Sequence, residues 1–191
     1  MKKIILASGS PRRKMLLEWA EIPFDVVVSD ADESFDATMP PVEIAIAIAQ
    51  KKNAAVVNNL KDDAATSIVI SADTIVVLHG EVIGKPVNRD DAIGILKRLS
   101  NQTHQVITAV CVRNKKQEKV FHDITLVCFH PLSDEQITHY VDFYKPYDKA
   151  GAYAIQEWIG VVGIKSIQGD FYNVMGLPVS RLLHTLQEAF L

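Results

Sequence analysis

The start of the chain constrains the fold most, because an apolar run there gives way to small polar residues, proline and arginine. The run Ile4-Ile5-Leu6 is typical of a buried strand. Ser10 is a preferred N-cap residue, and Pro11 suits the first position of a helix. The sequence therefore predicts a strand over 2–8, a tight serine-rich turn, and a helix over 11–20.

Two adjacent arginines, Arg12 and Arg13, lie in the first turn of that predicted helix. A helix N-terminus presents unpaired N–H groups and a partial positive charge, so it attracts anions. Guanidinium groups add planar, bidentate donors suited to phosphate. The first hypothesis is therefore a polyphosphate site. The alternative is an ordinary helix start with a solvated basic turn, and this motif alone does not choose between them.

Length and charge limit the classes of protein to consider. The 191 residues suffice for one large domain or two small lobes. The net charge of −3 argues against a general nucleic-acid binder. No apolar stretch approaches the roughly 20 residues of a membrane span, and the short apolar run after Met1-Lys2-Lys3 does not fit a signal segment. We expect a cytoplasmic protein without nucleic-acid or membrane partners.

The thiols and imidazoles give no sign of a metal centre. Cys111 and Cys128 lie in apolar, strand-like stretches and lack metal-ligand spacing, so we expect buried thiols in a reducing compartment. The six histidines show no motif spacing and are interpreted as structural.

Strands and helices are expected to alternate along the chain, which predicts an α/β protein. The elements expected after the first helix are a strand 26–28, a helix from 40 to about 58, a strand 67–78 with a short hairpin to 82–83, a helix 89–99 capped by Asn88, an antiparallel pair 104–113 and 119–130, a helix opened by a capping box at 133–136, a loop 148–158, a strand 161–167 and a helix 178–190. Three polar clusters, 8–13, 73–85 and 148–156, fall at strand ends or in loops. Open α/β sheets bind their ligands in such places.

The second cluster contains a carboxylate inside an apolar run. Asp73 interrupts residues 68–77, and such a carboxylate is costly unless it is paired, hydrogen-bonded or bound to a metal. A hairpin at His79-Gly80 would return Lys85 to the same end of the strand. Asp73 could then hold Mg²⁺ or orient a water, while Lys85 neutralises a leaving phosphate. The alternative is a structural ion pair, with Asp73 capping a turn.

The third cluster contains small residues and a side-chain amide. Gly151-Ala152 allows close backbone approach, and the Gln156 amide offers the donor and acceptor needed to read a base edge. Its alternative is a surface loop with an incidental glutamine. Two further features have ordinary interpretations when taken alone: Lys51-Lys52 is typical of a solvated helix face, and Glu33 is either a solvated acidic residue or a second metal ligand.

Taken in order along nearly the whole chain, these clusters resemble one family. The motifs that carry the resemblance are Ala7-Ser8-Gly9-Ser10-Pro11-Arg12-Arg13, Lys52, Ala72-Asp73-Thr74, Lys85-Pro86, Asp148-Lys149-Ala150-Gly151-Ala152-Tyr153, Ile155-Gln156, Asn173-Val174 and Gly176-Leu177-Pro178. They resemble the Maf, or septum-formation-inhibitor-like, nucleoside triphosphate pyrophosphatases.

The resemblance implies a fold and an activity. It implies one domain over 1–191 with a long, mixed, bent sheet flanked by helices in two lobes and a central cleft, similar to the inosine-triphosphate pyrophosphatase fold. It also implies hydrolysis of a nucleoside triphosphate to the monophosphate and pyrophosphate, a divalent cation (Mg²⁺ or Mn²⁺), and a homodimer.

The resemblance also implies roles by matching position. The residues expected to bind the triphosphate carry hydroxyl or guanidinium groups and are Ser8, Ser10, Arg12 and Arg13. The expected catalytic residues are Asp73, Lys52 and Lys85. Asp73 would be the general base or a metal ligand, and Glu33 would help to hold the metal. The positions associated with substrate preference are Arg12, Thr74 and Gln156.

The glutamine at position 156 resembles the subgroup acting on dTTP and UTP, whereas the subgroup acting on 7-methyl-GTP has glutamate there. We therefore expect pyrimidine triphosphates as substrates, with modified pyrimidines such as 5-methyl-UTP left open. Two positions depart from the family pattern. Glu157-Trp158 follows the glutamine where glycine is usual, and Asn53 replaces alanine after Lys52.

Three alternatives are weighed against this expectation. A non-catalytic nucleotide-binding regulator of septum formation is disfavoured by the complete set of aspartate, lysine and arginine residues. The Gln156 loop argues against a pyrophosphatase for purines such as ITP or XTP. A purely structural α/β domain would leave Asp73 and the paired arginines unexplained.

Overall fold

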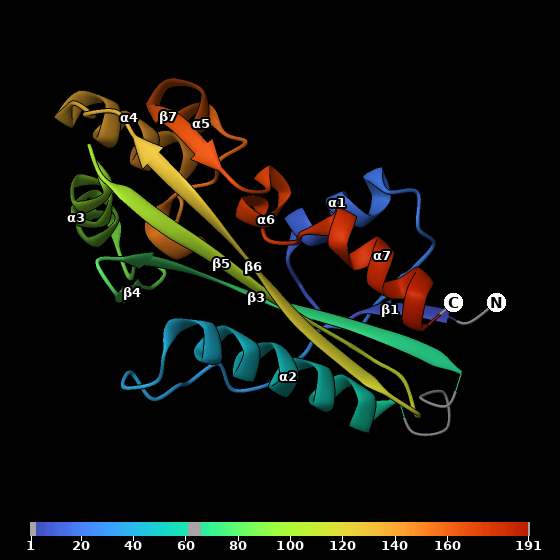
Figure 1. The fold of residues 1–191 in the computed structure, drawn as a ribbon. Helices are drawn as coiled ribbons and strands as arrows, with labels where there is room; N and C mark the ends of the chain where they lie inside the picture. The colour runs from blue at the N-terminus through green and yellow to red at the C-terminus, as the bar shows by residue number, and fades with distance from the viewer. Residues whose placement is uncertain (1–2, 61–65, 191) are drawn as a thin grey trace. The chain divides into compact units, whose positions relative to one another are not determined.

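The computed structural model describes residues 3–60 and 66–190. Helices and strands alternate along the chain (Figure 1), which confirms the predicted α/β class. The elements are β1 (Lys3–Leu6), α1 (Pro11–Trp19), β2 (Asp25–Val26), α2 (Pro41–Asn59), β3 (Ser67–Leu78), β4 (Glu81–Ile83), α3 (Arg89–Leu99), β5 (Thr103–Arg113), β6 (Glu118–Phe129), α4 (Asp134–Tyr144), the 3₁₀ turn η2 (Ala150–Ala152), α5 (Trp158–Gly163), β7 (Ile164–Gln168), α6 (Phe171–Met175) and α7 (Val179–Ala189).

Among the described residues, seven strands form one mixed sheet in the order β2-β1-β3-β5-β6-β7, with β4 paired to β3. β1 pairs in parallel with both β2 and β3, and its Ile4 lies opposite Ile68. Parallel neighbours need a crossover, and α1 supplies the one between β1 and β2. β4 and β7 pair antiparallel with β3 and β6, so the sheet is mixed as expected.

The chain divides into two compact units. Unit 1 comprises Met1–Asp73, Thr108–Asp123 and Gly176–Leu191, and unit 2 comprises Thr74–Ile107 and Ile124–Met175. The boundaries fall inside β3, β5 and β6, so each of these strands contributes residues to both units. The expectations of a single domain and of a cleft between two lobes stay predictions.

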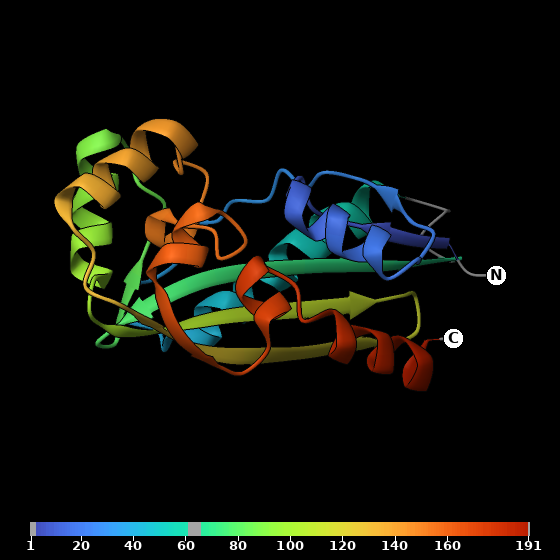
Figure 2. The same ribbon diagram turned by 90° about the horizontal axis from the view of Figure 1, so that it is seen from above.

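In unit 1, helices cover both faces of the sheet. Figures 1 and 2 show α2 along one face and α1 and α7 along the other. Ile5, Val56 and Val69 belong to one buried cluster that joins α2 to β1 and β3. On the other face, the Arg181 Nη1 group of α7 donates to the His122 carbonyl at 2.8 Å, which fixes α7 against β6.

In unit 2, α3 packs against α4 (Figures 1 and 2), and it also packs against η2. The predicted caps of both helices are confirmed. The Asn88 side chain accepts from the Asp91 amide, and Ser133 and Gln136 form the reciprocal capping box. Each cap satisfies N–H groups that the first helical turn cannot bond internally.

Several sequence-based expectations are wrong in detail. The predicted strand 161–167 begins only at Ile164, because Trp158–Gly163 forms helix α5. The β-branched pair Val161-Val162 favours a strand, but tertiary packing overrides this preference. Gly160 permits the helix, since a Cβ there would overlap the Ile155 carbonyl oxygen. Cys111 is buried as expected, whereas Cys128 is only partly buried.

Two further differences concern short elements. β2 has only two residues, and α6 was not anticipated.

Within the described part of the chain, no helix combines the length and apolar character needed to cross a membrane.

Candidate active site

Asp73 lies in the interior of β3 and is paired with a lysine. Its side chain is only 11% exposed, and its Oδ1 atom lies 2.7 Å from the Lys52 Nζ atom. The same ammonium group lies 2.8 Å from Glu33 Oε1. The prediction that Asp73 needs a partner is therefore confirmed. Of the alternative, the ion pair is present, but Asp73 does not cap a turn, because β3 continues on both sides of it.

The register of α2 explains why Lys52, and not its neighbour Lys51, reaches Asp73. Asn53 Nδ2 donates to the carbonyl groups of Val69 and Cys111 at 3.0 and 3.1 Å, and Ser71 Oγ donates to the Ala49 carbonyl at 2.7 Å. These bonds hold α2 on β3 and β5. The departure of Asn53 from alanine thus has a structural consequence, since it anchors the helix beside Lys52.

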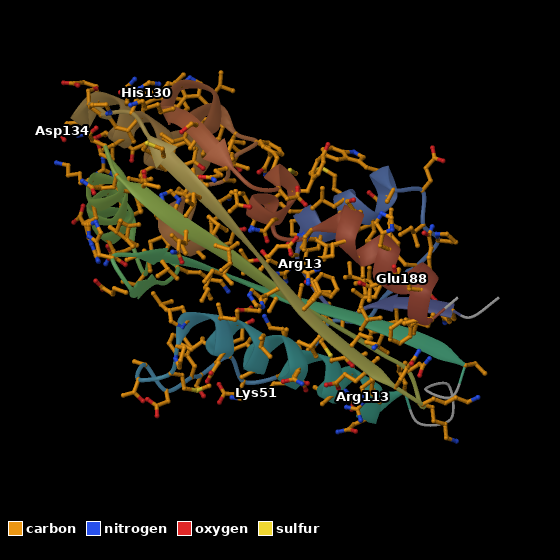
Figure 3. All side chains as sticks on the ribbon, viewed as in Figure 1. Arg13, Lys51, Arg113, His130, Asp134 and Glu188 are labelled. Carbon is orange, nitrogen blue, oxygen red and sulfur yellow. The ribbon has the colours of Figure 1, made fainter. Side chains whose placement is uncertain are left out.

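Lys51 is exposed, and its label in Figure 3 lies on the outer side of α2. Its Nζ atom donates to the Ser34 carbonyl at 3.0 Å, which ties the loop carrying Glu33 to the helix. The interpretation of the lysine pair as a solvated face therefore holds for Lys51 and is wrong for Lys52.

Arg13 is buried at the start of α1 and is held in a fixed orientation (Figure 3). Its Nε atom donates to the Gly176 carbonyl at 2.8 Å, and Nη1 donates to Ser8 Oγ at 3.2 Å. Burial lowers the pKa of Arg13. Asp73 opposes this shift, Arg12 adds to it, and Glu33 opposes it. The guanidinium group is thus close enough to both carboxylates to respond to their charge.

The hydrogen bonds of the serines at the start of α1 differ from the prediction. Ser10 occupies the N-cap position, but its side chain makes no capping hydrogen bond. The Ser10 amide instead donates to Ser8 Oγ at 3.2 Å, so Ser8 supports both this turn and Arg13. Unit 1 contains most of the predicted phosphate-binding and catalytic residues, namely Ser8, Ser10, Arg12, Arg13, Glu33, Lys52 and Asp73.

The remaining predicted residues belong to unit 2. Thr74 is partly exposed in β3, and Lys85 is exposed just beyond β4. The predicted meeting of Lys85 with Asp73 stays a prediction, because these residues belong to different units. Within unit 2, the Gly84 end of the second cluster does meet the third cluster, since the Gly151 amide donates to the Gly84 carbonyl at 3.1 Å.

Gly151 confirms the expected close backbone approach. Its φ of 71° is favourable for glycine, and a Cβ there would come within 2.9 Å of the Val76 Cγ2 atom. Residues 151–155 are buried and Gln156 is exposed. The alternative of a surface loop is therefore wrong for residues 151–155, whereas the role of the exposed Gln156 stays a prediction.

A ring cluster holds the buried part of this segment. Tyr153 packs edge-on against Phe129 and His104, and its hydroxyl group lies 2.7 Å from His104 Nε2. Burial lowers the pKa of His104 to about 4 and raises that of Tyr153. His104 is thus a neutral, buried partner of Tyr153 near pH 7, which agrees with its interpretation as structural.

Tyr140 is a further residue of this site, and no sequence-based expectation included it. Its hydroxyl group accepts from the Ala154 amide at 3.1 Å and also bonds to the Glu157 carboxylate. The available signal was the helical spacing of Ile137, Tyr140 and Val141, which places the tyrosine on the buried side of α4.

Comparison with known proteins identifies the family. The model of the family described as Maf-like protein matches residues 3–189. The chain belongs to the Maf family. The dTTP/UTP pyrophosphatase of Parabacteroides distasonis is 49% identical to it, over 97% of this chain and 95% of that protein. The protein of the same name from Bacillus cereus strain G9842 is 46% identical, over 98% of this chain and 96% of that protein.

A solved structure gives a more distant likeness. The Staphylococcus aureus Ham1 protein matches with a TM-score of 0.45 and 17% identity, covering 67% of this chain and 72% of that one. This likeness is too distant to bear on the fold.

The divalent cation expected for a Maf protein can be tested against the donor groups present. No group of three or more histidine, cysteine, aspartate or glutamate side chains suited to a metal occurs among the described residues. Asp73 and Glu33 nevertheless converge on one point, the Lys52 ammonium group. Mg²⁺ commonly takes one or two protein carboxylates and completes its shell with water and substrate phosphates. The two carboxylates match the number and type of protein ligands in that mode of binding.

Proposed function

We propose that this Maf protein is a nucleoside triphosphate pyrophosphatase that hydrolyses dTTP and UTP to the monophosphate and pyrophosphate. The observation that carries the proposal is the buried Asp73–Lys52 pair in unit 1, which Glu33 joins and whose carboxylates raise the pKa of Arg13 against the effect of burial. A buried carboxylate among cations suits a reaction in which water attacks a phosphate chain. The names of the curated relatives support the same activity.

The triphosphate is bound at the start of α1. Arg12 and Arg13 supply positive charge, and the hydroxyl groups of Ser8 and Ser10 supply further hydrogen bonds. Because Gly176 and Ser8 already hold the Arg13 guanidinium plane, little reorientation is needed when phosphate binds. Such fixed charges stabilise the transition state more than mobile ones do.

In the chemical step, the Asp73 carboxylate accepts a proton from the attacking water. The water oxygen forms a bond to the α-phosphorus, the bond from that phosphorus to the α–β bridging oxygen breaks, and pyrophosphate leaves with the electron pair. Lys52 and Lys85 neutralise the negative charge on the departing group. Charge stabilisation is the main contribution, as in phosphoryl transfer generally.

Asp73 and Glu33 would hold Mg²⁺ or Mn²⁺, which when bound neutralises charge on the phosphate oxygens. A cytoplasmic location and a homodimer belong to the same proposal and rest on the resemblance to the family.

The base is recognised in unit 2. The 4-oxo pyrimidine edge of UTP and dTTP offers an acceptor beside an N–H donor, and the Gln156 amide can match both. CTP carries a donor in place of that oxygen. The Gln156 amide therefore favours UTP over CTP when its orientation is fixed. Arg12 and Thr74 are the other residues proposed to influence substrate preference.

The test is a nucleotide panel at fixed Mg²⁺ with dTTP, UTP, CTP, ITP, GTP and 7-methyl-GTP, with products identified by chromatography. We expect monophosphate and pyrophosphate from dTTP and UTP. Preferred turnover of ITP would instead support the purine pyrophosphatase. Nucleotide binding without any turnover would overturn the proposal in favour of the non-catalytic regulator.

A further inference from the structure

The turn that carries Gln156 has a fixed backbone. The Glu157 amide donates to the Ala154 carbonyl at 3.1 Å, and the Glu157 carbonyl accepts from the Gly160 amide at 2.9 Å as α5 begins. Since residues 151–155 are buried, Gln156 is the first exposed side chain after a buried run. Hydrogen bonds thus hold the backbone that carries the Gln156 amide.

A single hydroxyl group joins the two ends of this turn. Tyr140 is fully buried in α4, and its Oη atom accepts from the Ala154 amide at 3.1 Å. The same hydroxyl donates its proton to the Glu157 carboxylate. Ala154 lies two residues before Gln156 and Glu157 one residue after it, so the tyrosine bonds to the chain on both sides of this side chain.

The Glu157 carboxylate is itself held from a second direction. Its Oε1 atom lies 3.6 Å from Lys149 Nζ, and that ammonium group also bonds to Asp148 Oδ1 at 2.8 Å. Lys149 is buried, so this charge interaction is less screened than one at the surface. The family's usual glycine at position 157 would have no carboxylate for either contact.

We infer that Tyr140 and Glu157 form a clamp that positions Gln156 and thereby sets the discrimination between 4-oxo and 4-amino pyrimidines. The inference rests on the proposed function, because it names what fixes the base preference of that same site. A glutamine amide separates the two base edges only if its donor and acceptor are held at a defined place. The clamp supplies that place without touching the phosphates.

The experiment compares kcat and KM for UTP and CTP in Tyr140→Phe, Glu157→Ala and Glu157→Gln. We expect the UTP/CTP ratio of kcat/KM to fall roughly tenfold in Tyr140→Phe and Glu157→Ala, which is about the effect of one lost hydrogen bond. The fall should come from a higher KM for UTP, with kcat little changed. Glu157→Gln should retain the ratio, since its amide oxygen still accepts from Tyr140.

Tyr144→Phe is the matched control. The Tyr144 ring stacks on Tyr140 with centroids 5.0 Å apart, and this substitution removes a hydroxyl group from a partly exposed side chain on the same helix. We expect wild-type values for both nucleotides. A fall equal to that in Tyr140→Phe would overturn the clamp, because it would show a general effect of disturbing α4.

A readout without substrate separates this inference from the proposed function. Amide hydrogen exchange at Ala154 and Glu157 should be faster in Tyr140→Phe and unchanged in Tyr144→Phe. Unchanged exchange in folded Tyr140→Phe and Glu157→Ala would overturn the clamp. Faster exchange with an unchanged UTP/CTP ratio would overturn its link to selectivity. If the wild type hydrolyses no pyrimidine triphosphate, the proposed function fails, while the exchange result still decides whether the clamp exists.

Discussion

The proposed phosphate site and the proposed base site are held in place by different kinds of interaction. In unit 1, Arg13, Lys52 and Asp73 are charged and buried, and each is held by another charge or by a backbone carbonyl. In unit 2, Gln156 is neutral and exposed, and its neighbours are fixed by a tyrosine hydroxyl group and by ring packing. The difference teaches that, under the proposed function, catalysis depends on buried charge, whereas selectivity depends on the position of a neutral side chain.

The two arrangements should therefore fail in different ways. Removing one member of a buried ion pair leaves its partner uncompensated, which is costly in both stability and chemistry. Loosening a neutral turn loses about one hydrogen bond and changes the preference for UTP over CTP. The variants below test whether loss of rate and loss of discrimination can be separated in this way.

Replacing Asp73 should have the largest effect. We expect Asp73→Asn to lose at least about 10²-fold in kcat/KM for UTP, because an amide cannot accept the proton from the attacking water. The UTP/CTP ratio should stay close to the wild-type value. Steady-state kinetics with product analysis measure both quantities. The exposed Asp90→Asn is the control, and near-normal turnover by folded Asp73→Asn would refute the role assigned to this carboxylate.

Replacing Arg13 by lysine keeps the charge but removes the planar donors. We expect the KM for UTP to rise roughly tenfold, because the ammonium group cannot bond to Gly176 and Ser8 while also meeting phosphate bidentately. The free energy of unfolding should fall by about 1–2 kcal/mol. Kinetics and urea unfolding measure the two effects. Arg98→Lys, in a surface ion pair, is the control, and equal losses in both variants would contradict the argument.

Changing Gln156 to glutamate should alter selectivity more than rate. A carboxylate accepts hydrogen bonds but does not donate them, so it no longer matches the 4-oxo edge. We expect the UTP/CTP ratio to fall roughly tenfold, comparable to the loss of one hydrogen bond. The same nucleotide panel measures the change. An unchanged UTP/CTP ratio in the variant would show that another residue reads the base.

The smallest expected effect is a change of stability with pH. The pKa of His104 is about 4 in the folded chain and 6.5 in its ordinary state, so between these values the unfolded chain binds more protons. This contribution to stability is therefore present above pH 6.5 and is lost as the pH falls toward 4. At pH 5.5 the free energy of unfolding should be lower by about 1 kcal/mol for this reason.

Replacing that histidine by glutamine should remove this part of the pH dependence. Urea unfolding between pH 4.5 and 7.5, compared for the wild type and His104→Gln, measures it. His139→Gln is the control, since His139 lies on α4 outside the ring cluster. Parallel curves for the wild type and His104→Gln would contradict the assignment to His104.

The features that could be predicted from the sequence follow from local pattern or from the free-energy cost of burying an unpaired charge. Asp73 in an apolar run required a partner, and the capping residues Asn88 and Ser133 opened helices where expected. The paired arginines placed positive charge at the start of α1. Each of these conclusions depends on a few neighbouring residues and on general physical chemistry.

The features that the sequence did not reveal depend on contacts between distant residues. Local pattern cannot show that Lys52, and not Lys51, is the buried one, because the anchor of α2 is formed by Asn53 with β3 and β5. Helix α5 was missed because its valines favour a strand and its helical path depends on Gly160. The role of Tyr140 depends on a hydroxyl group that reaches a segment beyond the end of its own helix.

Gly160 also limits how this protein can be redesigned. Any larger residue there would push α5 away from the Ile155 carbonyl group and shift position 156 with it. A library aimed at new bases should therefore vary position 156 and leave glycine at 160. Natural sequence change meets the same restriction, because the exposed side chain at position 156 can vary while the backbone beneath it has no room to shift.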